Sequence, residues 1–537
     1  MMPTSTPRSV LRHAALLAAS IGFLLSAAPG RAAVYEKYIL VVPLRPANAA
    51  AQKQAWFGPA FRTALQQAAL SMQTLVFLKD DELSALQKEF GFGAGEPEPG
   101  QMERVADSKE IAVLHGSYRL EGDSLVVECQ VIAGRNVEGR TFKVAGSTRA
   151  LRPLFSSIWE QVCKNLNLTV TEREAELLKL IPGTDSWAAL EAYQQAWVAA
   201  GANPESSEAC RAALPHLERS LKQDPKFVPA LALRSECLWT LDGPRAATAK
   251  KGSRPPAMRD LDRCLKLQPE NPLVMNAHER FLIDQKAYEE ARVEGEKNLS
   301  LYPTNYRNYL QLAEAYRRLK RVPDAERLLI SGLDQQGTDF QKMPFNLSLG
   351  LLLLKSKDEH AEIYLRDVLK LIPKNAKLRY LRAGALYRLQ RYLDAMHEVQ
   401  QAEAVKSWAE LLKLKALIAT ALGNRFYEEG DFDRAYSYTT IAMNLRPNHF
   451  EVLLLLAKVM RKKGFHEQAR QQLDAAQRAA RKSHPKDHMW LGTEYVAQGF
   501  RDEGAKEYTL YLKLNPKAPE RRRLISLIRQ LQGETDE

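Results

Sequence analysis

The sequence predicts an α+β protein, in which an N-terminal domain of order βαβαβββα precedes an all-α superhelical solenoid. Two features lead to this prediction. Between Tyr38 and Leu168, apolar runs of strand length alternate with segments of helical periodicity. From about residue 185 onward, a degenerate pattern of about 34 residues recurs. Because 537 residues are too many for one hydrophobic core, two architectural parts are expected.

Residues 1–32 have the features of a secretory signal peptide. Arg8 and Arg12 precede an apolar stretch from about Ala14 to Ala28, and small residues then allow cleavage after Ala32. The apolar stretch is shorter than the roughly 20 residues of a membrane-spanning helix, although an uncleaved anchor is the alternative. We therefore expect an exported protein of the bacterial periplasm, whose association with the membrane is only indirect.

The α/β domain is expected over residues 35–170. Its first strand is an apolar run, Trp56, Phe61 and Leu65 then follow at helical spacing, and a two-strand hairpin turns at Gly122. The expected strands are Tyr38–Leu44, Thr74–Phe77, Ile111–Leu120, Ser124–Ala133 and Arg140–Ala145, with helices after the first, second and last of them.

This part of the chain resembles the TolB amino-terminal-like domain that precedes helical repeats in bacterial envelope proteins. The resemblance rests on the strand ending Val42-Pro43-Leu44, on the segment Val113-Leu114-His115-Gly116-Ser117-Tyr118, and on Gly122-Asp123-Ser124-Leu125-Val126-Val127 after it. It implies a non-catalytic domain that contacts partner proteins.

The repeats occupy residues 185–518. The clearest unit places Leu422, Gly423, Phe426, Gly430 and Ala435 at the positions of the tetratricopeptide repeat (TPR) pattern, which the chain resembles in about nine helical hairpins. Small residues let the two helices of a unit cross closely, and neighbouring units stack around a concave groove. Residues 519–537 are expected to form a capping helix and a tail.

The resemblance to TPR proteins also implies which side chains line the groove. The positions that usually face it give a basic and aromatic set, which suits an extended acidic peptide or an exposed C-terminus. The alternative is a merely solvated inner face. The set is Arg307, Arg317, Arg318, Lys377, Tyr380, Tyr387, Arg388, Asn424, Tyr427, Lys458, Arg461 and Lys462.

The charge of the chain indicates the class of partner, and its cysteines indicate which disulfides are possible. The formal net charge is +12, which favours anionic partners, and the alternative is that these charges simply solvate the helix surfaces. No nucleic-acid-binding module is present in the sequence. Five cysteines in an exported chain cannot all pair with one another. Cys129 and Cys163 are the best candidates for a disulfide, and buried free thiols are the alternative.

The sequence contains no catalytic or nucleotide-binding motif, such as G-x-S-x-G, Walker A or H-E-x-x-H. His484 and His488 have the spacing of two metal ligands on one helix, but Pro485 places them at a turn, so two surface histidines are expected. Asp431 is expected to cap a helix. We therefore expect neither an enzyme nor a resident cofactor or metal.

These features favour a periplasmic adaptor for the assembly of an envelope complex, such as a secretion, pilus, gliding-motility or polysaccharide-export machine. The alternative is a sensory module whose N-terminal domain binds a small ligand and signals to a membrane partner. The sequence determines neither the partner nor the oligomeric state.

Overall fold

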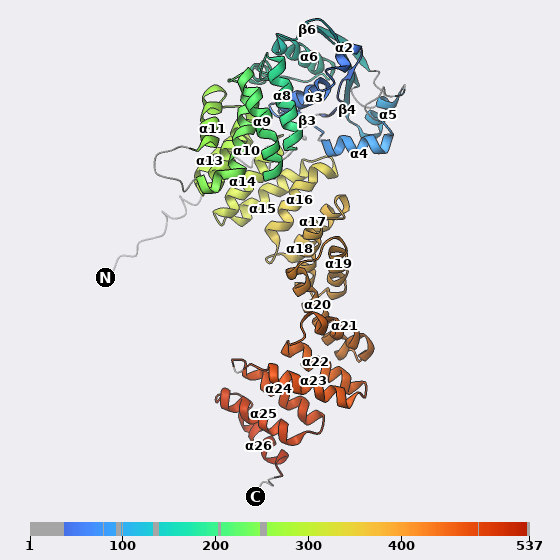
Figure 1. The fold of residues 1–537 in the computed structure, drawn as a ribbon, viewed down its shortest axis with the longest axis vertical. Coiled ribbons are helices and arrows are strands. Elements are labelled where there is room, and N and C mark those ends of the chain that lie inside the picture. Colours follow the sequence, from blue (N-terminus) through green and yellow to red (C-terminus); the bar gives the residue numbers. More distant parts are fainter. Residues whose placement is uncertain are drawn as a thin grey trace, which may run out of the picture. The chain divides into compact units, whose positions relative to one another are not determined.

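The computed structural model describes residues 37–78, 80–92, 98, 100–132, 139–201, 206–246, 255–481 and 483–533 (Figure 1). The chain divides into two compact units, Met1–Phe345 and Asn346–Glu537. The predicted signal peptide lies outside the described residues. Among the helices that are described, none is both long and apolar enough to cross a lipid bilayer.

The first unit opens with a mixed sheet of strand order β3-β1-β4-β5-β6, in which the short β2 pairs with β4. β1 is parallel to β3 and β4, whereas β4, β5 and β6 are antiparallel. The predicted hairpin turn is confirmed: Glu121 pairs with Ser124, and Gly122 has a φ of 62°, which glycine adopts without steric cost. The strands are β1 (Lys37–Val41), β2 (Arg45–Pro46), β3 (Leu75–Phe77), β4 (Ala112–Glu121), β5 (Ser124–Ile132) and β6 (Arg140–Ser147).

Helices cover both faces of the sheet. Ile39 and Val41 face the core formed with α3 and α6, whereas Leu40 between them faces α4 and α5, as the alternation of side chains along a strand requires. The helices of this domain are α2 (Ala49–Gln52), α3 (Phe57–Ala69), α4 (Asp80–Phe90), α5 (Gln101–Lys109), α6 (Leu151–Asn165) and α7 (Glu172–Leu178).

The predicted βαβαβββα order is confirmed, with added short elements that the sequence did not reveal. The main addition is α5, whose buried side chains Met102, Val105 and Ala106 pack on the sheet. These apolar residues follow a segment rich in glycine and proline, and they are too few to show a helical period by themselves.

The described helices that follow form nine successive pairs and a final single helix (Figure 1). The pairs are α8 (Trp187–Ala200) with α9 (Ser207–Gln223), α10 (Val228–Ala246) with α11 (Pro256–Leu267), α12 (Pro272–Asp284) with α13 (Tyr288–Leu301), α14 (Tyr306–Arg318) with α15 (Val322–Asp334), α16 (Asp339–Leu353) with α17 (Asp358–Leu371), α18 (Ala376–Arg388) with α19 (Tyr392–Val405), α20 (Ala409–Glu428) with α21 (Phe432–Leu445), α22 (Phe450–Lys462) with α23 (His466–Ala479), and α24 (Pro485–Ala497) with α25 (Arg501–Leu514). The final helix is α26 (Arg521–Leu531).

Local sequence sets where many of these helices begin. Asn305 lies two residues after Pro303, and its side chain accepts a hydrogen bond from the backbone of Arg307, which caps α14. Asn271 and Asn375 cap α12 and α18 in the same way. Asp431 caps α21, as predicted. A proline that cannot continue a helix, followed by an asparagine that starts one, therefore marks several boundaries between pairs.

Within the first unit, the sheet domain packs directly on the first repeats. The Trp187 ring of α8 stacks on Phe57 of α3 with the centroids 5.1 Å apart, and Gln67 donates a 2.6 Å hydrogen bond to the Tyr193 hydroxyl. One continuous hydrophobic core joins the sheet to α8, α9 and α10.

The sheet domain also contacts the turns that follow α13 and α15 in the same unit. The Thr304 hydroxyl donates to the Met72 carbonyl at 2.6 Å, and the Tyr38 hydroxyl donates to the Gln335 carbonyl at 3.3 Å. The division between the two compact units therefore falls within α16, and not at the end of the sheet domain.

Candidate partner-binding surfaces

The predicted groove residues of the second unit lie on the first helices of successive pairs. α18, α20, α22 and α24 contact one another in that order, so equivalent positions on them form rows. One such row is continuous: the Arg461 guanidinium of α22 acts on Tyr427 of α20, where its positive charge partly offsets the rise in the Tyr427 pKa that burial causes. Arg461 in turn donates to Glu494 of α24 at 2.7 Å and 3.3 Å. The structure thus brings Tyr427 and Arg461 together.

Two of the predicted arginines in this unit have internal carboxylate partners. Arg388 binds Asp358 with two hydrogen bonds of 2.6 Å and 2.7 Å, and this guanidinium holds the pKa of the Asp358 carboxyl below its usual range. Glu494, the partner of Arg461, is buried. Each arginine therefore stabilises contacts between repeats, because removing it would leave a carboxylate without its partner.

The remaining predicted residues of the second unit differ in exposure. Lys377 and Lys462 are exposed and Lys458 is half-buried, and no ion pair involves these lysines in the described part of the chain. The Lys377 ammonium lies 5.2 Å from the centre of the Tyr380 ring, which also contacts Trp408. The other members of the set here are the exposed Asn424 and the half-buried Tyr387.

An apolar residue on the same surface was missed by the prediction. Leu417 is 40% exposed and lies on α20 seven residues before Asn424, so both occupy one face of that helix. The spacing of two helical turns could have identified it. Together with Tyr380 and Tyr427, Leu417 adds apolar area to the first helices of these pairs.

The three predicted arginines of the first unit lie on α14. Arg317 and Arg318 both bind Glu314, at 2.6 Å and 2.7 Å, and both are exposed. Arg307 is half-buried near the start of the helix. These arginines belong to the first unit, whereas the other predicted groove residues belong to the second.

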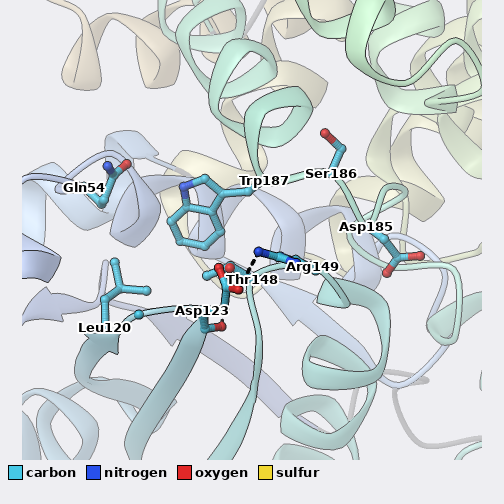
Figure 2. A pocket seen from close by; sticks show the side chains of 9 residues that line it. Gln54, Leu120, Asp123, Thr148, Arg149, Asp185, Ser186 and Trp187 are labelled. Carbon is cyan, nitrogen blue, oxygen red and sulfur yellow. Dashed lines mark hydrogen bonds and ion pairs between the residues drawn. The ribbon is translucent and has the colours of Figure 1, made fainter.

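A cavity of about 510 Å3 lies in the first unit, where the β4–β5 turn and the β6–α6 connection meet the start of α8 (Figure 2). Arg149 and Asp123 form an ion pair of 2.7 Å in its wall, and the Trp187 ring forms another part of that wall. Asp185 binds Arg152 at 2.7 Å. The charges in this wall are therefore already paired. The lining residues are Gln54, Leu120, Gly122, Asp123, Thr148, Arg149, Asp185, Ser186 and Trp187.

The cysteines are all buried free thiols in the structure. Cys129 and Cys163 belong to the same hydrophobic core, but no bond joins them, so the disulfide between them stays a prediction. Burial raises the pKa of each of these two thiols to about 12. Few thiolates therefore form at neutral pH, which makes either cysteine a poor nucleophile.

The prediction of two surface histidines is wrong for His488. α24 begins at Pro485, so His488 lies within the helix, where it is buried with its Nδ1 atom 2.7 Å from Glu507. His484 is exposed before the helix. No group of three or more His, Cys, Asp or Glu side chains that could hold a metal occurs among the residues with described positions.

Comparisons with known proteins agree with this architecture. The tetratricopeptide repeat family matches the chain at residues 282–342 and 426–486, so the chain contains tetratricopeptide repeats. No curated protein matches the sequence.

Several solved structures are similar to parts of the chain. Pseudomonas aeruginosa pilF is 18% identical over 43% of this chain and 97% of its own, with a TM-score of 0.28. A tetratricopeptide repeat protein of Parabacteroides merdae is 14% identical over 47% of this chain and 97% of its own, with a TM-score of 0.27. The human IFIT1 dimer with PPP-AAAA is 16% identical over 67% of this chain and 78% of its own, with a TM-score of 0.33.

Proposed function

We propose that this protein is a non-catalytic periplasmic adaptor whose later repeats hold an acidic segment, or an exposed C-terminus, of a cell-envelope protein. Tetratricopeptide repeats are a scaffold for protein–protein interaction, because their stacked helices present an extended surface instead of an enclosed site. The finer proposal rests on one observation, which is the surface formed by α18, α20 and α22.

This surface combines cations with apolar area. Lys377, Lys458 and Lys462 supply positive charge, while Tyr380 of α18 and the 40% exposed Leu417 of α20 supply apolar area. Lysines attract carboxylates of a partner, and tyrosines bury apolar area while keeping a polar tip in water. An extended acidic peptide satisfies both requirements.

Photo-crosslinking in cells tests this proposal. A photoreactive residue at Leu417 or Asn424 should capture the same envelope protein, because both positions are exposed on α20. The exposed Ser437 of α21 and Gln471 of α23, on the second helices of their pairs, are the matched controls and should capture little of it.

A charge reversal identifies the residues that bind. Replacing Lys458 and Lys462 with Glu should weaken capture about tenfold, because two attractive charges become repulsive. Arg478→Glu, an exposed change on α23, is the control. Arg388 and Arg461 are poor choices for this purpose, since their reversal would also break the pairs with Asp358 and Glu494. Two results would contradict the proposal. One is equal capture of the partner from Leu417, Asn424, Ser437 and Gln471. The other is undiminished capture by the protein with Lys458→Glu and Lys462→Glu.

Export is tested independently of binding. We expect the mature protein in the periplasmic fraction, with an N-terminus at Ala33, and a chain without residues 1–32 in the cytoplasm. Recovery of the intact leader on a membrane-bound protein would instead favour the uncleaved anchor.

The cavity of about 510 Å3 beside Trp187 favours the second candidate function, which is sensing of a small polar molecule by the first unit. A ligand that binds only the folded state raises the midpoint of thermal unfolding. A metabolite library should therefore give a shift that disappears in Trp187→Ala, if this function is the correct one. A library without any such shift would leave the adaptor as the better proposal.

A further inference from the structure

The final helix, α26, leaves apolar side chains uncovered. Leu524 is buried, but Ile525 and Ile528 are half-exposed and line a cavity of about 400 Å3. The opposite wall of this cavity is formed by Leu512 and Lys513 of α25. We call the cavity the α25–α26 groove.

The equivalent apolar position in an earlier repeat is buried. Ile525 lies nine residues after Pro516, and Leu456 of α22 lies nine residues after Pro447. Leu456 is 4% exposed, in a helix that packs against its own second helix, α23. In the described part of the chain, no such second helix packs on α26. The α25–α26 groove is therefore the place where the second helix of a further pair would lie.

The groove between α23 and α24, one pair earlier, is occupied by α25 and shows what kind of helix lies in such a groove. α25 contacts both α23 and α24: Arg470 of α23 donates to Glu503 at 3.1 Å, and Gln477 donates to Glu507 at 2.7 Å. His488 of α24 lies 2.7 Å from the other oxygen of Glu507. Two carboxylates four residues apart on one face of α25 thus fix it in that groove.

The rim of the α25–α26 groove is basic. Lys513, Arg521 and Arg529 line it around the two isoleucines, and Arg522 and Arg523 are exposed at the start of α26. A carboxylate on an incoming helix meets attraction there. A second copy of this chain would bring the same cations to the contact, which disfavours self-association through this surface.

We propose that the α25–α26 groove binds an acidic amphipathic helix of a partner protein. The apolar face of that helix covers Ile525 and Ile528, while its carboxylates bind Lys513, Arg521 or Arg529. This site is separate from the surface on α18, α20 and α22, so the two proposals stand or fall independently.

Fluorescence anisotropy with the full-length protein and a designed peptide tests the proposal. The probe is a labelled helical peptide of 14 residues, the length of α25, with leucines on one face and two glutamates four residues apart, as Glu503 and Glu507 are. A control peptide carries lysines in place of the glutamates. We expect saturable binding of the acidic peptide that weakens as salt is added, and binding at least about tenfold weaker for the lysine peptide.

Variants locate the binding. Lys513→Glu changes an exposed side chain, so the fold should persist, and it should weaken binding of the acidic peptide about tenfold. Ile528→Asp removes apolar contact and should have a similar effect. Lys458→Glu with Lys462→Glu, on the other surface, should leave this binding unchanged.

Three results would overturn the proposal. The first is the absence of binding by the acidic peptide up to about 1 mM. The second is binding that Lys513→Glu and Ile528→Asp leave unaltered. The third is a concentration-dependent dimer that Ile528→Asp dissociates and the peptide does not, since a second copy would then occupy the groove.

Discussion

In the earlier and the later repeats, the turn between the two helices has the same backbone conformation but different residues. In the later repeats the second residue after the first helix is Gly430, Gly464 or Gly499, with φ between 80° and 89°. The equivalent residues of earlier repeats are Lys286, Lys320 and Gln390, whose φ values are 66°, 62° and 59°.

The hydrogen bonds of the two kinds of turn are alike. The Gly464 amide donates to the Arg461 carbonyl, and the next amide donates to Met460. The Lys320 amide donates to the Arg317 carbonyl, and the next amide to Tyr316. Both are the motif that commonly ends a helix with a left-handed residue. The turn therefore requires a left-handed backbone in both groups of repeats. The earlier repeats have side-chain-bearing residues at this position, and these residues are strained in that conformation.

The helix contacts show a second contrast. Seven residues before the left-handed position, the later repeats place Gly423, Ala457 or Gly492 against the second helix, whereas the α12–α13 pair places Glu279 there. Glu279 is fully buried and accepts a hydrogen bond from Asn298. A side chain on Gly295 would lie 2.4 Å from its carboxylate, so a glycine on the second helix makes room for it.

The largest effect should come from copying the Glu279 arrangement into a later repeat. In Gly492→Glu, the new Cβ would lie 2.8 Å from the Tyr508 ring, and a carboxylate would be buried without a partner. We expect a loss of about 4 kcal/mol of local stability. Hydrogen–deuterium exchange should then be about a thousandfold faster in α24 and α25. Lys486→Glu, exposed on the same helix, is the control. Unchanged protection in Gly492→Glu would contradict the conclusion that the later repeats need a small residue at this helix contact.

A smaller effect should depend on pH and should be confined to the earlier repeat. Burial raises the pKa of Glu279 to about 8, from 4.5 in the unfolded chain. Between these values the unfolded state loses its proton while the folded state keeps it, so stability falls as pH rises. The loss approaches 1.4 kcal/mol per pH unit and reaches about 3 kcal/mol by pH 7.

Glu279→Gln tests this dependence, because the amide can keep a bond to Asn298 but does not titrate. The variant should exchange α12 and α13 amides like the wild type at pH 4.5 and more slowly than the wild type at pH 7.5. Comparing the two proteins at each pH cancels the intrinsic pH dependence of exchange. Equal protection at both pH values would show that Glu279 does not titrate in this range.

The contrast also explains which repeats could be recognised from the sequence. Gly430, Gly464 and Gly499 marked the later turns, so the positions around them were assigned directly. Lysine at an equivalent turn carries no such signal, since lysine is common on any helical surface. The succession of strands and helices along the sheet domain was predictable because apolar patterns reveal each element separately. Its packing on α8 was not, since the contact of Phe57 with Trp187 joins residues far apart in sequence.

The candidate surface was predictable in composition but not in pairing. Helical position gave Tyr427 and Arg461, and the structure joins them. The carboxylates that bind Arg388 and Arg461 are 30 and 33 residues away, in neighbouring helices. A separation close to one repeat length could have suggested those pairs. The positions within one helix, taken alone, could not have suggested those pairs.

The smallest effect should come from exchanging the turn residues themselves. Gly464→Ala should destabilise the α22–α23 pair by about 1 kcal/mol, because alanine is strained at a φ of 83°. No atom lies within 4 Å of the added Cβ, so the change measures backbone strain without a clash. Lys320→Gly should stabilise the α14–α15 pair by about 0.5 kcal/mol, since the relief of strain is partly offset by the greater freedom of glycine in the unfolded chain. Gly384→Ala is the matched control: it lies within α18, where glycine costs stability, so the same substitution should stabilise. Local hydrogen exchange measures all three, and a Gly464→Ala variant as stable as the wild type would mean that the earlier turns carry no strain.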